Sequence, residues 1–221
     1  VGVGPGDPRL ITYLAADTIR SCPVIAVPAE TKEQAVSYRI ASGLITDLDK
    51  KQCLTFSIPM TKDKGLLETA YRNAADQVEE QLKAGRDVAC LTLGDPTVYS
   101  TYIYLHRLIR DRGYRTEIIS GVPSFCAVSA RLGDSLADRS QQLHIIPSAY
   151  GVEDVLKLPG TKVLMKAGSK MAAVKEALER ECVSGVMVEN CGMENESIFQ
   201  GVQEIPDKAG YYSLIVIKEQ K

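Results

Sequence analysis

The sequence predicts an α/β protein, and two observations lead to that prediction. Short runs rich in β-branched and other apolar residues alternate with longer amphipathic segments along the first half of the chain. Three such runs end in glycine-rich turns, which is typical of the strand-to-helix connections of open α/β sheets. We therefore expect a mostly parallel sheet covered by helices on both faces.

Four runs of the first half are expected to be strands, at residues 24–27, 53–58, 88–93 and 116–119. The clearest helix is expected over residues 65–83, where apolar residues recur at every third or fourth position and form one stripe. The stripe should face the core, and Gly85 supplies a stop just beyond its end. A further helix is expected over residues 98–112.

The composition of the sequence becomes polar after about Gly133, where a connection covers residues 134–142. We expect a domain boundary here, with an N-terminal α/β domain over residues 1–135 and a C-terminal α/β domain over residues 136–221. Expected strands of the second domain lie at residues 143–146, 162–165, 185–188, 197–202 and 211–217, and a helix at 171–181. Several of these strands follow one another without a helix, so antiparallel pairing and a mixed sheet are expected.

The composition favours a small-molecule substrate. With 28 acidic and 26 basic residues among 221, the chain has no net positive field that would attract nucleic acid or an anionic membrane surface. No apolar stretch approaches the roughly 20 residues that cross a bilayer, and the opening VGVGPGDP lacks the basic and apolar regions of a signal peptide. The expected location is therefore cytoplasmic, with no membrane and no nucleic acid among the partners.

Cysteine and histidine usage predicts reduced thiols and no bound metal. The six cysteines include no C-x-x-C pair and no spacing typical of zinc ligands. His106 and His144, the two histidines, are far apart in sequence, and neither has a carboxylate or cysteine cluster beside it.

The three glycine-rich turns are candidate ligand loops. The opening VGVGPGDP lets a ligand approach the backbone closely, because glycine has no side chain to block it. Its spacing does not fit G-x-G-x-x-G, which argues against a dinucleotide. The second loop covers residues 91–101 and the third residues 119–124, and Asp95 and Ser124 in them also fit the simpler role of helix caps. Three glycine turns at one edge of a sheet favour a binding site.

The motifs in these loops resemble the signature set of the tetrapyrrole methylase family. VGPGDPRLIT opens the chain, GDPTVYST begins at Gly94, and SGVPS begins at Ser120. PMTKD at residues 59–63, VEN at 188–190 and YYSLI at 211–215 also fit, so the resemblance covers nearly the whole chain. GDPTVYSTY and PMTKD are most similar to the pattern of precorrin-2 or cobalt-factor II C-20 methyltransferases. Ser120 and Pro123 depart from the family's usual Pro and Thr.

The resemblance implies two α/β domains with S-adenosyl-L-methionine folded into the cleft between them, and S-adenosyl-L-homocysteine as product. The implied cofactor contacts, carried over by motif position, are Leu93, Gly94, Asp95, Val98, Pro123, Ser124, Ala167 and Cys191. The loop of Pro5, Gly6 and Asp7 is expected to border the tetrapyrrole substrate, because this cofactor has no phosphate. The family is typically homodimeric, so a homodimer is the implied assembly.

The implied reaction is methylation of the C-20 meso carbon of precorrin-2 or cobalt-factor II in cobalamin (vitamin B12) biosynthesis. The sulfonium is already an activated leaving group, so the protein mainly aligns the reactants and excludes water. Asp7, Asp95 and Tyr99 are candidate bases for the meso proton on motif position only, and each also fits a structural or cofactor-binding role. Candidate partners for the substrate's carboxylates are Arg9, Lys62, Arg131, Arg139 and Lys166, each of which also fits an ordinary surface charge.

Three other functions stay open at this point. A relative with the same fold would methylate another tetrapyrrole position, RNA or a protein side chain. A nicotinamide-dependent dehydrogenase of the same pathway would need the glycine loops to hold a dinucleotide. A non-catalytic tetrapyrrole carrier would bind the pigment without S-adenosylmethionine.

Overall fold

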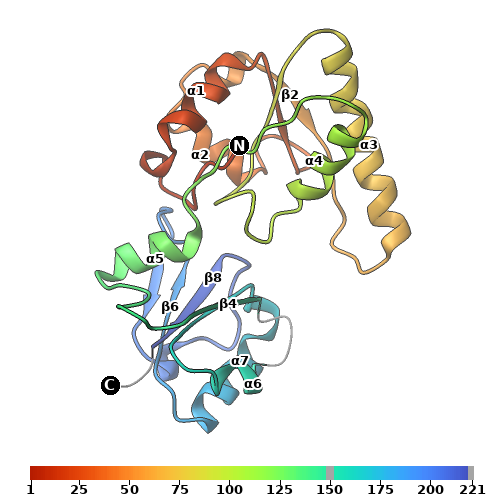
Figure 1. Cartoon of the computed structure of the whole chain (residues 1–221). Helices are drawn as coiled ribbons and strands as arrows, with labels where there is room; N and C mark the ends of the chain where they lie inside the picture. The colour runs from red at the N-terminus through yellow and green to blue at the C-terminus, as the bar shows by residue number, and fades with distance from the viewer. Residues whose placement is uncertain (148–151, 219–221) are drawn as a thin grey trace. The chain divides into compact units, whose positions relative to one another are not determined.

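The computed structural model describes residues 1–147 and 152–218. The chain divides into two compact units, Val1–Pro123 and Ser124–Lys221 (Figure 1). Helix α5 (Ser124–Leu132) falls in the second unit, where its Arg131 forms an ion pair with Glu196. The predicted boundary between residues 135 and 136 lies just beyond this helix, and a division into domains at that point stays a prediction.

The first unit is built on a parallel sheet with the strand order β2-β1-β3. The strands are β1 (Val24–Val27), β2 (Gln52–Thr55) and β3 (Val88–Cys90). Helices α1 (Tyr13–Ser21) and α2 (Val36–Ser42) lie on one side of it, and α3 (Lys64–Lys83) and α4 (Tyr102–Asp111) on the other (Figure 1). Two short 3₁₀ helices, η1 (Pro8–Leu10) and η2 (Leu48–Lys50), complete the unit.

Successive residues of these strands point to opposite faces, which buries the sheet on both sides. Cys53 and Ala89 pack in the cluster that includes Ala15 and Ile19 of α1, whereas Leu54 and Val88 pack against Val78 and Leu105 of α3 and α4. The predicted parallel sheet with helices on both faces is thereby confirmed.

Several boundaries in this unit differ from the sequence prediction. Strand β3 ends at Cys90, short of the predicted residue 93. Strand β2 ends at Thr55, short of the predicted residue 58. Helix α4 begins at Tyr102 instead of residue 98, because the chain turns at Tyr99, which has a φ of +48°. Residues 116–119 are not a strand: Gly2 N–H donates to the Ile119 carbonyl at 2.9 Å, but no ladder of pairs follows from it.

The second unit holds a five-stranded mixed sheet with the order β4-β5-β8-β6-β7. The strands are β4 (Leu143–Pro147), β5 (Thr161–Met165), β6 (Gly185–Glu189), β7 (Ser197–Phe199) and β8 (Ser213–Ile217). Only the β4–β5 pair is parallel among the described strand pairs, and β5–β8, β6–β8 and β6–β7 are antiparallel. The predicted mixed sheet is confirmed.

One face of this sheet packs on helices α6 (Glu153–Leu156) and α7 (Met171–Arg180). Leu164, Met187 and Ile215, from three adjacent strands, form that core with Leu178 of α7. Two 3₁₀ helices, η3 (Gly168–Lys170) and η4 (Val202–Glu204), connect its strands. Within residues 1–147 and 152–218, no helix is both long and apolar enough to cross a bilayer.

Helix α3 is stabilised at its start by Asp63, whose carboxylate accepts the N–H groups of Gly65 at 2.8 Å and Leu66 at 3.1 Å. Asp63→Ala is expected to lower the free energy of unfolding of the first unit by about 1 kcal/mol, because these donors lose their acceptor. Asp63→Asn retains an oxygen at this position and should stay close to the wild type. Urea unfolding followed by circular dichroism measures both variants, and equal losses in the two would contradict the capping role.

Candidate functional site

Three loops of the first unit meet beyond the carboxyl ends of β1 and β3. Val3 N–H donates to the Thr92 carbonyl at 2.9 Å, and Gly94 N–H donates to the Gly4 carbonyl at 2.8 Å. Gly2 N–H reaches the Ile119 carbonyl at 2.9 Å. The opening loop therefore lies between the loops at residues 91–101 and 119–124, as expected for three glycine turns at one sheet edge.

Glycines at the contact allow this approach. A Cβ atom on Gly121 would lie 2.2 Å from the Gly94 carbonyl oxygen, and one on Gly2 would lie 2.7 Å from the same oxygen. Gly94 itself has a φ of +69°, a conformation that side chains other than glycine rarely adopt. Backbone packs directly on backbone here, so even a methyl group at Gly2 or Gly121 would force the loops apart.

Asp95 joins the second loop to the third. One carboxylate oxygen accepts the Gly121 N–H at 2.9 Å and the Ser120 hydroxyl, and the other accepts the Thr97 N–H at 2.7 Å and the Thr97 hydroxyl. Burial raises the pKa of Asp95, but the hydrogen bonds from Ser120, Thr97 and Gly121 outweigh it and hold that pKa below its usual value. The residue is only 5% exposed, so it acts as an ionised brace between loops.

Asp7, from the opening loop, is also engaged. Its carboxylate caps η1 by accepting the Arg9 N–H at 2.9 Å, and it accepts the Arg9 guanidinium at 2.6 Å. The side-chain and backbone hydrogen bonds from Arg9 hold the pKa of Asp7 below its usual value. Pro5 and Gly6, the other predicted substrate-loop residues, are buried beside it.

The sequence did not single out Thr12, which joins the start of α1 to the third loop. Its hydroxyl caps α1 by accepting the Ala15 N–H at 3.2 Å and donates to the Ser120 carbonyl at 3.3 Å. The signal was present, because a threonine just before an amphipathic segment is a helix-cap signature.

The predicted cofactor residues fall into two groups by unit. Leu93, Gly94, Asp95, Val98 and Pro123 belong to the first unit, while Ser124, Ala167 and Cys191 belong to the second. In the first unit, Leu93 packs against the core and Gly94 and Asp95 are buried, so the second loop offers mainly backbone groups. Tyr99 stands at its far end and is 44% exposed.

In the second unit, Ala167 and Cys191 lie at one edge of the mixed sheet. Strand β8 lies between β5 and β6 and is antiparallel to both, with Met165 opposite Leu214 and Glu189 opposite Ser213. The carboxyl ends of β5 and β6 therefore sit on either side of the start of β8, about 10 Å apart at the spacing of two strand steps.

Both strands turn sharply at that edge. Lys166, which follows β5, has a φ of +58°, and Asn190, which follows β6, has a φ of +54°. Non-glycine residues adopt such angles only where neighbouring structure enforces them. Asn190 N–H donates to the Tyr212 carbonyl at 3.1 Å, which ties one of these turns to the strand between them.

Glycines and glutamates that sequence reasoning did not single out complete this edge. A Cβ atom on Gly168 would lie 2.6 Å from the carbonyl oxygens of Ala209 and Gly210. Glu189 accepts the Gly210 N–H, and Glu196 accepts the Gly192 N–H at 2.8 Å. Glu189 and Gly210 are far apart in sequence, as are Gly168 and Ala209, whereas Glu196 and Gly192 are four residues apart. The sequence motifs pointed to none of these contacts.

The five basic residues that are candidates for binding substrate carboxylates differ in the contacts that they already make. Arg9 is paired with Asp7, and Arg131 with Glu196 at 2.6 Å. Lys166 Nζ lies 5.7 Å from the centre of the Tyr211 ring. Lys62 and Arg139 are exposed, and neither forms an ion pair with an acid in the described part of the chain.

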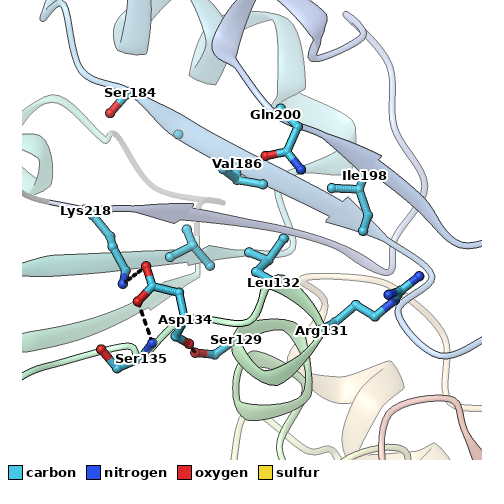
Figure 2. Close-up of a pocket in the computed structure, with 12 residues that line it drawn as sticks. Ser129, Arg131, Leu132, Asp134, Ser135, Ser184, Val186, Ile198, Gln200 and Lys218 are labelled. Carbon is cyan, nitrogen blue, oxygen red and sulfur yellow. Dashed lines mark hydrogen bonds and ion pairs between the residues drawn. The ribbon is translucent and has the colours of Figure 1, made fainter.

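A pocket of about 400 Å³ lies in the second unit, where the end of α5 meets β6, β7 and β8 (Figure 2). Leu132, Val186, Ile198 and Val216 give it an apolar floor, with Arg131 and the Asp134–Lys218 ion pair among its polar lining. None of the predicted cofactor residues lines this pocket. We therefore place the candidate ligand site at the loops, where the close backbone contacts are, and not in this pocket.

Asp95→Ala is expected to lower the free energy of unfolding by about 2–4 kcal/mol, because buried donors lose a charged acceptor. The folded pKa of Asp95 is depressed, so its stabilisation is present above the unfolded pKa of about 3.9 and is lost as the pH falls through the folded pKa. Urea unfolding should show a wild-type-to-variant difference that is constant above roughly pH 5 and shrinks below about pH 4.

The exposed Asp111, paired with its neighbour Arg110, supplies the control for this measurement. Asp111→Ala should show little loss at any pH. An Asp95→Ala difference that does not shrink in acid would rule out the ionised brace.

Two curated relatives match this chain over its length. It is 31% identical to the "Probable cobalt-precorrin-2 C(20)-methyltransferase" of Methanocaldococcus jannaschii, covering 100% of this chain and 95% of the relative. It is 29% identical to the cobalt-precorrin-2 C(20)-methyltransferase of Salmonella typhimurium, again covering 100% of this chain and 95% of the relative.

Solved structures share the fold. A cobalt precorrin-4 methyltransferase of cobalamin biosynthesis superposes with a TM-score of 0.78 at 18% identity, covering 99% of this chain and 92% of its own. The uroporphyrin-III C-methyltransferase of Thermus thermophilus, solved with S-adenosyl homocysteine, gives 0.71 at 18% identity over 99% of this chain and 95% of its own. Residues 1–205 match the family described as Tetrapyrrole (Corrin/Porphyrin) Methylases. Together with the three converging glycine loops, this match shows that the chain belongs to the tetrapyrrole methylase family.

Proposed function

We propose that this protein transfers a methyl group from S-adenosyl-L-methionine to the C-20 meso carbon of precorrin-2 or its cobalt complex, in cobalamin biosynthesis. The observation that carries the proposal is similarity over the whole chain to relatives named as C(20)-methyltransferases. The nicotinamide dehydrogenase alternative is not favoured, because the family is one of methylases. A cytoplasmic location and a homodimeric assembly are part of the same proposal.

The loops suit a cofactor that is aligned by backbone groups. When bound, S-adenosylmethionine supplies an activated methyl group, so the chain's own task is to hold the reactants in line and exclude water. We assign the backbone of Gly94 and Val98 and the small residue Ala167 to contacts with this molecule. Gly94 is fixed by its bonds to Gly4, so its backbone is held in place before a ligand arrives. Ala167 has no exposed surface and packs in the core of the second unit, so its contact with the cofactor requires the chain around it to move.

The substrate would approach from the side of the opening loop, with Asp7 at its border. Asp7 already holds the Arg9 guanidinium, so a substrate carboxylate that binds Arg9 competes with Asp7 for it. Asp95 is the least suited of the three candidate bases, because it is only 5% exposed and its oxygens already accept four hydrogen bonds, whereas the Asp7 side chain is 22% exposed. Tyr99, at the exposed end of the second loop, stays with Asp7 as a candidate for proton removal.

The first test of the function is transfer of labelled methyl from S-adenosylmethionine to anaerobically prepared precorrin-2 and cobalt-factor II, in parallel reactions. Label is expected at carbon 20, located by NMR of the product, and the faster substrate identifies the natural form. Label at another meso or ring carbon would reassign the position, and transfer to neither pigment would send the search to RNA and protein acceptors.

Lys62 and Arg139 are expected to hold substrate carboxylates. Lys62→Ala and Arg139→Ala should each raise the KM for the tetrapyrrole by about tenfold, since a charge-assisted contact is lost, and leave the Kd of S-adenosylhomocysteine unchanged. Arg72→Ala removes a surface arginine that pairs with Glu68 on α3 and serves as the matched control. Wild-type kinetics in the single and paired variants would reject the assignment.

A further inference from the structure

Arg131 and Glu196 form an ion pair inside the second unit that reaches the predicted cofactor edge. Arg131 Nε donates to Glu196 Oε1 at 2.6 Å, while Glu196 Oε2 accepts the Gly192 N–H at 2.8 Å. The Glu196 side chain is only 15% exposed. One carboxylate therefore holds a helix side chain with one oxygen and a backbone amide next to Cys191 with the other.

The turn that Glu196 holds has a left-handed backbone on both sides of Cys191. Asn190 and Gly192, on either side of Cys191, have φ angles of +54° and +78°. Asn190 N–H is fixed by the Tyr212 carbonyl at 3.1 Å, and the Asn190 carbonyl accepts Met193 N–H at 2.9 Å. On the other side of Cys191, the Glu196 carboxylate accepts the Gly192 N–H. Cys191 is thus presented by a backbone held at both ends.

Helix α5 carries the other end of this connection. Ser124 is its first residue and Arg131 lies seven residues later, so the two lie on the same face, about 10 Å apart along the axis. Arg131 extends from α5 on the side of the pocket away from the Asp134–Lys218 pair (Figure 2). The ion pair with Glu196 therefore fixes the helix that begins at Ser124 to the turn that contains Cys191.

Local electrostatics keep the Glu196 carboxylate ionised, and the Arg131 side chain that pairs with it is 58% exposed. Burial raises the pKa of Glu196, but the Gly192 N–H and the Arg131 guanidinium outweigh it and hold that pKa below its usual value. Burial, followed by the neighbouring Glu196 charge, raises the pKa of Cys191 to about 11. The carboxylate stays ionised and the thiol stays protonated near neutral pH, so Cys191 serves as a small packing group and not as a nucleophile.

We propose that Arg131 and Glu196 are positioning residues for the methyl donor: they hold Ser124 and Cys191 in the relative placement that S-adenosylmethionine binding requires. The inference rests on the proposed function, because both contacts were assigned to the cofactor by family resemblance. It removes Arg131 from the candidates for substrate carboxylates, since its charge is already committed to Glu196. The role acts through backbone geometry, so it should affect affinity for the cofactor more than turnover.

A double-mutant cycle tests the connection, with Arg131→Ala, Glu196→Ala and the double variant. Each single change is expected to raise the Kd of S-adenosylhomocysteine, measured by calorimetry, by about tenfold, and the double variant should bind no more weakly than the weaker single one. The KM of S-adenosylmethionine should rise in step, whereas kcat and the KM of the tetrapyrrole should change little. Glu196→Gln retains an oxygen for Gly192 N–H and should recover part of the affinity.

The Asp134–Lys218 ion pair lines the same pocket without touching the Cys191 turn, and it supplies the matched control. Asp134→Ala, Lys218→Ala and their combination should leave the Kd of S-adenosylhomocysteine unchanged. Alkylation of Cys191 by iodoacetamide, followed by mass spectrometry, gives a second readout. It should be faster in Arg131→Ala than in the wild type, because the turn is released, whereas loss of the Arg131 charge alone would raise the pKa of the thiol and slow the reaction. It should be slower in both proteins when S-adenosylhomocysteine is present.

The outcomes separate the two proposals. A wild-type protein that does not bind S-adenosylhomocysteine would overturn the proposed cofactor, and the positioning role with it. Wild-type binding together with Arg131 and Glu196 variants that bind equally well would overturn the positioning role alone. If Glu196→Ala does not fold, Arg131→Lys and Glu196→Gln, which keep the side-chain length, provide the same comparison.

Discussion

Direct packing of backbone on backbone among three glycines is the constraint on which the predicted ligand edge of the first unit depends. A single added carbon on Gly121 would meet the Gly94 carbonyl oxygen at 2.2 Å, and one on Gly2 would meet it at 2.7 Å. That closeness draws three chain segments together and buries the glycines at the contact. It also leaves no room at the contact for a side chain that could accept hydrogen bonds from the buried amides. A carboxylate beside the contact therefore has to supply the acceptor. Asp95 fills this role by accepting the Gly121 N–H at 2.9 Å.

The elements of the fold were largely predictable, because their signals are local. The stripe in α3 and the short apolar runs of β1 and β3 are properties of neighbouring residues, so the sheets and the helices expected at 65–83 and 171–181 lie close to their predictions. Boundaries failed where a tertiary contact decided them. Residues 116–119 have a strand-like composition, yet their bond to Gly2 is not followed by a ladder. Helix α4 starts late because Tyr99 has a left-handed backbone that composition does not reveal.

The candidate site was less predictable, for a physical reason. Ala167 and Cys191 offer no charged or metal-binding group, and they were named only through resemblance to a family. Their placement comes from topology: strand β8 separates β5 from β6 and brings the two strand ends to one edge. Glu189 and Glu196 hold that edge in part through partners far along the chain, Gly210 and Arg131, which no spacing rule contains. A backbone-built site therefore leaves a weak signature in a single sequence even when its structure is well defined.

Carboxylates at both predicted ligand edges share one task. Asp95 accepts the Gly121 N–H, Glu196 accepts the Gly192 N–H and Glu189 accepts the Gly210 N–H. An ionised acceptor forms a stronger bond with an amide than a neutral one, and a glycine amide has no side chain to shield it. Hydrogen bonds of this kind hold the pKa values of Asp95 and Glu196 below their usual range, so these two acids do not readily take up protons. That suits a reaction whose leaving group is already activated, because its barrier is lowered by alignment of the reactants more than by acid–base exchange. The arrangement of acids thus agrees with methyl transfer from a sulfonium and offers little to a hydrolytic mechanism, which would need a free base at the same loops.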